Sequence, residues 1–166
     1  MRFLFVRSPV RVVAFFVFCC YALCEKGSYR NAGEAVDVTN IEIVYRFFKE
    51  GYENKNYDAV MSCVATDYVD HSPAGARGNA QAVEILRIVA SQFSELTVTV
   101  LDIFSDGDMV ATRVLFEGIH AGVCMGIPAT GKRICFEALE NFRVTGGKIV
   151  ESWGYWPDKE IEEKLR

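Results

Sequence analysis

The segment TVTVLDIFSDGDMVATRVLFEGIHAG, residues 97–122, decides the fold class of this chain. Apolar and polar residues alternate on both sides of SDGD, a turn-forming sequence, and this pattern predicts two long antiparallel strands. The segment RICFEALENFRV, residues 133–144, alternates in the same way, and TGGK then turns the chain into IVESWGYW, residues 149–156. The second half of the chain therefore predicts about four long antiparallel strands.

Helices are predicted before these strands, and a shorter one after them. Apolar residues recur at helical spacing in three segments: residues 40–52, 58–64 and 79–94. Thr39 or Asn40 can cap the first of these helices, and the segment YVDHS, residues 68–72, is a brief extended piece before the third. Pro157 and Asp158 open the closing helix DKEIEEKL. This order predicts an α+β fold in which a curved sheet and about three helices enclose an apolar cleft of small-molecule size.

The first 38 residues carry a different signal. Arg2, Arg7 and Arg11 precede an uncharged run at residues 12–24, which is typical of a secretory signal peptide; a transmembrane helix needs about 20 apolar residues. We therefore expect a signal peptide at 1–24, a flexible lead-in at 25–38 and one domain at 39–166. Secretion, or residence in the lumen of the secretory pathway, follows from this interpretation, with an uncleaved signal anchor as the alternative.

Composition excludes several classes of function. The 166 residues carry a formal net charge of −4, and without the leader the charge is more negative, so the chain has no basic face for nucleic acid. We expect no metal site, because the sequence contains no CxxC motif and no Cys/His ligand spacing. Its glycines lie in turn sequences outside any strand–loop–helix unit, which gives nucleotide binding no support.

Three cysteines remain once the leader is removed. Cys124 and Cys135 are symmetric about the GIPATGK loop, residues 126–132, and residues that face each other on paired strands lie near disulfide range. We therefore predict a disulfide between these two cysteines, which would leave Cys63 as a buried free thiol.

Five short motifs occur in order along the chain. They are DHSP (70–73), GDMVATR (107–113), GIHAG (118–122), GIPATGK (126–132) and FRVTGGKIVESW (142–153). Together they resemble the SnoaL-like polyketide cyclase family, of the nuclear-transport-factor-2-like superfamily, over nearly all of residues 40–166. The resemblance implies a conical α+β fold and a deep pocket for a small, largely apolar carbonyl compound. It also implies a homo-oligomer and an intramolecular aldol condensation without metal or cofactor.

The resemblance implies that a carboxylate near the end of the last strand serves as the base in this chemistry. The family pattern places an Asp four residues after a Trp; here Trp153 is followed by Pro157 at that spacing, and Asp158 lies one position later. Asp158 is thus our first candidate for the base. Because Asp also favours helix N-caps, a capping role stays open.

Glu140 is a second candidate carboxylate. It shares one face of its predicted strand with apolar residues, where a charge is unfavourable unless it is paired or functional. Burial would raise its pKa toward neutrality and suit it to acid–base work. The alternative is a structural ion pair with Arg113.

His71 and His120 are the two histidines of the chain, and they match the family's Asp-His-x-Pro and Gly-Thr-His-x-Gly patterns. Either one can move a proton or donate a hydrogen bond to a developing enolate oxygen; otherwise it is a buried histidine that bonds strand ends. Four further residues are predicted to bind substrate: Arg113, Phe142, Trp153 and Tyr155. A non-catalytic binding protein for an apolar molecule, or a hydrolase of epoxides or esters, remains the alternative function.

Overall fold

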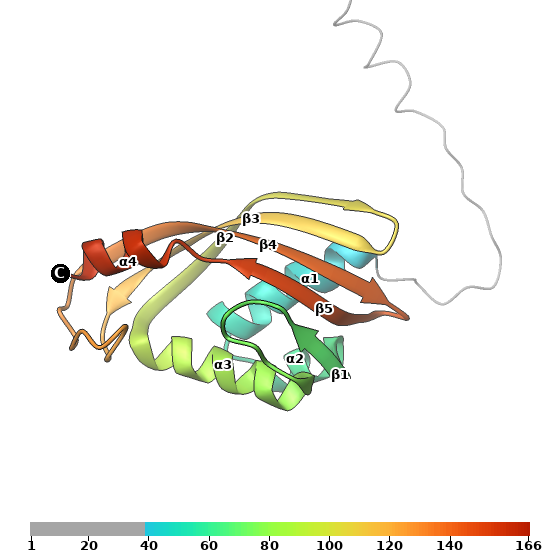
Figure 1. Cartoon of the computed structure of the whole chain (residues 1–166), viewed down its shortest axis with the longest axis horizontal. Coiled ribbons are helices and arrows are strands. Elements are labelled where there is room, and N and C mark those ends of the chain that lie inside the picture. The colour runs from blue at the N-terminus through green and yellow to red at the C-terminus, as the bar shows by residue number, and fades with distance from the viewer. Residues whose placement is uncertain (1–38) are drawn as a thin grey trace, which may run out of the picture. The chain divides into compact units, whose positions relative to one another are not determined.

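A computed structural model describes residues 39–166, which form four α-helices, one π-helix and a five-stranded sheet (Figure 1). In chain order the elements are α1 (Asn40–Phe48), η1 (Lys49–Glu53), α2 (Tyr57–Cys63), β1 (Val64–Asp70), α3 (Gly78–Gln92), β2 (Phe93–Asp106), β3 (Met109–His120), β4 (Arg133–Thr145), β5 (Lys148–Tyr155) and α4 (Asp158–Leu165). The predicted α+β class is confirmed. The expected signal peptide and lead-in lie outside the described residues.

The sheet has the order β1-β5-β4-β3-β2 and is antiparallel except for one pair. That pair is β1 with β5, which run parallel, with Asp70 opposite Ser152. Residues 68–70 of the extended piece expected at 68–72 are therefore the end of a longer edge strand, and residues 71 and 72 follow it. Helices α1, α2 and α3 lie on one side of this curled sheet (Figure 1). No helix within residues 39–166 is long and apolar enough to cross a membrane.

Local sequence explains the first helix. Thr39 Oγ1 accepts a hydrogen bond from the Glu42 backbone N–H, and the Glu42 carboxylate accepts one from Thr39 N–H, which completes a capping box. The apolar stripe of α1, continued through η1, packs on the inner face of the sheet. Phe47 and Phe48 there contact Phe142 of β4, with ring centroids 5.7 and 5.6 Å apart. This aromatic cluster is the centre of the core.

The predicted disulfide is wrong. Cys63, Cys124 and Cys135 are all free thiols in the structure. The register of β3 and β4 puts Cys135 opposite Glu117. Cys124 lies in the connecting loop, where its backbone forms an isolated antiparallel β-bridge with Ile127. The loop is thus not centred on the GIPATGK segment, because the chain between the strands folds back on itself before β4 begins.

Candidate active site

A cavity of about 950 Å³ lies between α3, the inner face of the sheet and the first turns of α4. Apolar side chains of α3 form one wall, including Ile85, Leu86 and Val89. Polar side chains from β1, the turn after it, β4 and β5 form the opposite wall: Tyr68, Asp70, Ser72, Glu140 and Ser152. A cavity with an apolar side and one cluster of polar groups is typical of a small-molecule site.

Glu140 stands on the inner face of β4, where its neighbours on the same face are buried and apolar. Its side chain is 7% exposed, and its Oε1 accepts a hydrogen bond of 2.8 Å from Trp156 Nε1–H. Burial raises the pKa of Glu140 to about 7; the Trp156 bond opposes this shift, and the charge of Asp70 adds to it. A carboxyl group in this condition can take or give a proton near neutral pH.

Asp70 ends β1 on the same wall and is 8% exposed. Its Oδ1 accepts hydrogen bonds from Ser72 N–H at 2.8 Å and from Ser152 Oγ at 3.3 Å, and its Oδ2 accepts one from Ser72 Oγ at 2.8 Å. Ser152 Oγ also hydrogen-bonds Tyr68 Oη, so the Tyr68 hydroxyl donates when Ser152 donates to Asp70. Asp70 is therefore the centre of a connected polar network.

Two tyrosines border this network. Burial raises the pKa of Tyr68, a lining residue, far above its ordinary value, and burial together with the charge of Glu140 does the same for Tyr52. Both phenols are thus neutral near pH 7, and the Tyr68 hydroxyl hydrogen-bonds Ser152 Oγ. Within residues 39–166 no three His, Cys, Asp or Glu side chains are grouped so that they could hold a metal ion.

The sequence profile of the SnoaL-like polyketide cyclase family matches residues 42–165. The chain belongs to this family. Two curated relatives, both from Streptomyces, are similar to it. The aklanonic acid methyl ester cyclase DnrD of S. peucetius is 29% identical over 127 residues, which cover 72% of this chain and 85% of the relative. DauD of strain C5, a cyclase with the same name, is 29% identical over 71% of this chain and 75% of the relative.

Solved structures agree on the fold. TsrD of Streptomyces laurentii superimposes with a TM-score of 0.71 at 23% identity over 80% of this chain and 98% of its own. IdmH of Streptomyces antibioticus superimposes with a TM-score of 0.69 at 26% identity, over 76% of this chain and 98% of its own. An LEH-like epoxide hydrolase of M. tuberculosis superimposes with a TM-score of 0.60 at 21% identity, over 76% of this chain and 88% of its own.

Asp158, the first candidate in this SnoaL-like domain, borders the cavity but is exposed. The helix-capping alternative is wrong in detail, because Pro157 is the N-cap residue of α4 and Asp158 is the first residue inside the helix, where its side chain makes no capping hydrogen bond. Asp158 therefore borders the cavity as an exposed residue of α4 and makes no hydrogen bond to Glu140 or Asp70 within residues 39–166.

The two histidines lie apart from the cavity lining. His71 Nε2 is 2.8 Å from Glu151 Oε2, and its ring stacks on Trp153 with centroids 4.8 Å apart, so the two predicted residues lie together. His120 is fully buried at the end of β3, and its Nδ1 accepts a hydrogen bond from Thr130 N–H. Its Nε2 has no hydrogen-bond partner among residues 39–166.

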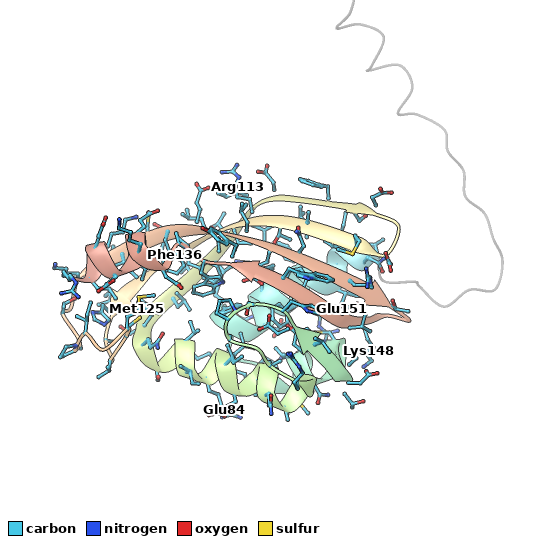
Figure 2. All side chains as sticks on the ribbon, viewed as in Figure 1. Glu84, Arg113, Met125, Phe136, Lys148 and Glu151 are labelled. Atoms are coloured by element: carbon cyan, nitrogen blue, oxygen red, sulfur yellow. The ribbon has the colours of Figure 1, made fainter. Side chains whose placement is uncertain are left out.

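The expected ion pair between Arg113 and Glu140 is wrong. Arg113 projects from the opposite side of the sheet (Figure 2), where it binds Asp102 Oδ2 at 2.7 Å and Glu137 Oε2 at 3.0 Å. The reason is strand periodicity, since Glu137 and Glu140 differ by an odd number of positions and point to opposite faces. Arg113 is thus placed away from any ligand in the cavity.

The remaining predicted binding residues divide between core and surface. Phe142 is completely buried in the aromatic cluster and does not border the cavity. Tyr155 borders the cavity at its edge and is 73% exposed. Of the eight residues that the sequence singled out, the cavity wall thus contains Glu140, Asp158 and Tyr155.

Sequence reasoning missed Asp70, Ser72 and Ser152. The motif DHSP drew attention to His71, whereas its Asp and Ser are the residues that face the cavity. Alternation along YVD was the available signal, because it puts Tyr68 and Asp70 on one face and His71 on the other. The pairing that brings this face to β5 is visible only in the folded chain.

Proposed function

We propose that this SnoaL-like domain is a cofactor-independent cyclase or isomerase in which Glu140 is the catalytic base. One observation carries the proposal: a carboxyl group on the apolar inner face of β4 borders the cavity, where burial raises its pKa to about 7. Nothing positively charged neutralises it, since its hydrogen-bond partner within residues 39–166 is the indole of Trp156. A buried carboxylate with a raised pKa and no ion pair is the usual condition of a general base.

The reaction that fits is an intramolecular aldol condensation. The ionised Glu140 carboxylate removes a proton from a carbon next to a carbonyl group, which leaves an enolate. The enolate carbon attacks a second carbonyl of the same molecule, a carbon–carbon bond closes the ring, and the resulting alkoxide takes the proton back from Glu140. Atoms and electrons balance within the substrate, and the protein ends as it began.

The substrate class follows from the cavity and the relatives. A volume of about 950 Å³ with an aliphatic wall from α3 suits a small, largely apolar molecule, and the polar wall suits its oxygen atoms. The curated relatives are cyclases of aklanonic acid methyl ester. We therefore propose a polyketide-like carbonyl compound as the substrate.

Proton abstraction can be tested without the true substrate. A cyclic 1,3-dicarbonyl probe exchanges its acidic C–H hydrogen with deuterium oxide, and NMR follows the rate. We expect Glu140→Gln to lower the protein-catalysed rate by roughly 10²–10⁴-fold, because Gln keeps the acceptor for Trp156 but cannot take a proton. Glu137→Gln, on the outer face of the same strand, is the matched control and should leave the rate unchanged. Equal rates for wild type and Glu140→Gln would refute the base.

A hydrolase of epoxides is the second candidate function. It is favoured by the polar network around Asp70 beside Glu140, which could hold a water molecule, and by the fold shared with the mycobacterial epoxide hydrolase. Incubation with styrene oxide distinguishes the two: diol formation that depends on Glu140 supports hydrolysis. Binding of aromatic probes without exchange or hydrolysis would indicate a non-catalytic binding protein.

We also propose that the domain is exported. The proposal rests on three arginines ahead of the uncharged run at residues 12–24. Expression of the full chain in a eukaryotic secretory host should give a product in the medium that begins at or near Glu25. A membrane-bound product that retains Met1 would contradict export.

A homo-oligomer is proposed from the family resemblance alone. Light scattering of the purified protein at micromolar concentration should give the mass of a dimer or larger assembly, and a monomer mass would refute the proposal.

A further inference from the structure

Two carboxylates line one wall of the cavity, and hydrogen bonding treats them differently. Asp70 accepts bonds from Ser72 N–H, Ser72 Oγ and Ser152 Oγ, whereas Glu140 accepts one from Trp156 Nε1–H. Hydrogen bonds to a carboxylate favour its ionised form. Asp70 is therefore the carboxylate of the pair that the protein surrounds with hydrogen-bond donors.

The same hydrogen bonds leave Glu140 without a further hydrogen-bond donor from this network. Ser72 and Ser152 both direct their hydroxyl hydrogens to Asp70, and Tyr68 then directs its own to Ser152. None of these three hydroxyl groups, in that arrangement, has a hydrogen left for Glu140. The network thus stabilises a charge at Asp70 and offers nothing to a charge at Glu140.

Asp70 and Glu140 lie on the two strands that flank β5, and β5 has no side chain at Gly154 between them. Asp70 is opposite Ser152, and Glu140 is opposite Gly154, two positions along on the same face. A Cβ atom added at Gly154 would lie 3.6 Å from Glu140 Cδ and 3.6 Å from Ser72 Cβ. Because Gly154 has no side chain, no protein atom of that residue fills the space between Glu140 and the turn that holds Asp70.

We propose that Asp70 is a positioning residue that acts through Glu140. Its fixed negative charge, held by Ser72 and Ser152 across the gap at Gly154, opposes a second negative charge and so makes Glu140 keep its proton to higher pH. This inference rests on the proposed role of Glu140 as the base. It gives that base the proton affinity to remove a weakly acidic C–H hydrogen.

Other charged or titratable groups near the pair make no hydrogen bond or ion pair with the Glu140 carboxylate within residues 39–166. Arg77, the N-cap residue of α3, donates from Nη1 to the Asp70 backbone oxygen at 2.7 Å, so this cation binds the main chain of Asp70. Tyr52 from η1 and Tyr68 from β1 are neutral phenols near pH 7 because burial raises their pKa values. Asp158, Glu160 and Glu163 of α4 are further acids at the edge of the cavity. Lys159, also on α4, is the one cation among the lining residues, all of which belong to residues 39–166.

The test is a titration of individual carboxyl groups by carbon-13 NMR in the full-length protein. We expect Asp70→Asn to lower the midpoint of Glu140 by about one pH unit, because a like charge is removed while the shape is kept. Ser72→Ala removes the hydroxyl donor but keeps the Asp70 charge, so its shift of the Glu140 midpoint should be smaller than that of Asp70→Asn. Gly154→Ala places a methyl group in the gap without changing a charge, so the Glu140 midpoint should not fall.

Two results would overturn the proposal. One is a Glu140 midpoint in Asp70→Asn that is unchanged or higher. The other, which needs no variant and hence no assumption about folding, is an Asp70 in the wild type that protonates at or above the Glu140 midpoint.

The exchange assay separates this inference from the proposed function. If Glu140 is the base, the acid limb of the pH–rate profile of Asp70→Asn should move down by the same amount as the NMR midpoint, and the plateau rate should fall. If the Glu140 midpoint moves in Asp70→Asn but the exchange rate does not respond to any change at Glu140, including Glu140→Gln, the charge coupling is supported and the cyclase proposal is refuted.

Discussion

The two faces of β4 treat a glutamate in opposite ways. Glu137 points outward, remains half exposed and pairs with Arg113 at 3.0 Å. Glu140, three positions later, points inward, is 7% exposed, and binds the neutral indole of Trp156. The first is an ordinary surface ion pair, and the second has a pKa near 7. The face of the strand, more than the residue type, thus decides what a carboxylate can do.

The same contrast holds for apolar residues. Phe142 is completely buried among Phe47 and Phe48, whereas Leu139 on the outer face is 54% exposed. The sequence expected Phe142 to bind substrate, but its inward direction leads into the core beneath α1 and not into the cavity. An inward position on a strand is therefore not sufficient to place a side chain in the cavity.

The largest expected effect is the loss of stability when an inward apolar side chain of β4 is removed, compared with an outward one. Phe142→Ala should lower the free energy of unfolding by about 3–5 kcal/mol, because it leaves a void that the aromatic cluster cannot fill. Leu139→Ala should lower it by less than about 1 kcal/mol. Urea unfolding of both variants measures the difference, and similar losses would mean that the two faces are not distinct.

The next effect is the pH dependence of stability that comes from Glu140. Its pKa is raised from 4.5 to about 7 on folding, so between these values the folded state binds more protons than the unfolded state. Stability from this group is full below pH 4.5 and is lost as the pH rises to 7, by roughly 3 kcal/mol in all. Glu140→Gln should remove that loss. Urea unfolding of wild type and variant at pH 5 and pH 8 isolates it, and an unchanged difference between the two proteins would contradict the raised pKa.

A smaller effect sharpens the role of Trp156. Trp156→Phe keeps an aromatic ring against Tyr52 and Phe116 but removes the N–H that stabilises ionised Glu140. The pKa of Glu140 should rise by about one unit. NMR titration measures it, with Trp153→Phe on the outer face as the control. A fall in the Glu140 midpoint would show that the indole is not its donor.

The smallest effect concerns Asp158. Since its side chain makes no capping hydrogen bond, Asp158→Asn and Asp158→Ala should each change the free energy of unfolding by less than about 0.5 kcal/mol. Neither should reduce deuterium exchange as Glu140→Gln does. A hundredfold loss of exchange in Asp158→Asn with unchanged stability would instead restore Asp158 as the base.

The sequence predicted most of the frame. Alternation identified strands β2 to β5 and assigned Glu140 to the same buried face as Phe136 and Phe142, which the structure confirms. Helical spacing and the Thr39 cap located α1. These features are local, because a period of two or of 3.6 residues can be read from neighbours in the chain.

The loop and the edges of the sheet could not be predicted in the same way. The Cys124–Cys135 symmetry assumed a hairpin centred on a short motif, but the register is set by packing of both strands in the core. The predicted Arg113–Glu140 pair assumed that opposite charges on two neighbouring strands lie on the same face. The side chains of a strand alternate between faces, so Arg113 pairs with Asp102 and Glu137 on the outer face while Glu140 points inward.

By itself the sequence determined which residues face inward along β4, and with them the presence of a carboxylate in an apolar interior. Only the tertiary structure decided that Asp70 joins it, because this depends on the parallel pairing of β1 with β5, segments about 80 residues apart. Such a pairing leaves no periodic pattern in the sequence, because it forms only when the helices, the sheet and the turn pack together and exclude water. The pKa of Glu140 is likewise a property of the folded surroundings, because it depends on which atoms replace the water around the carboxyl group.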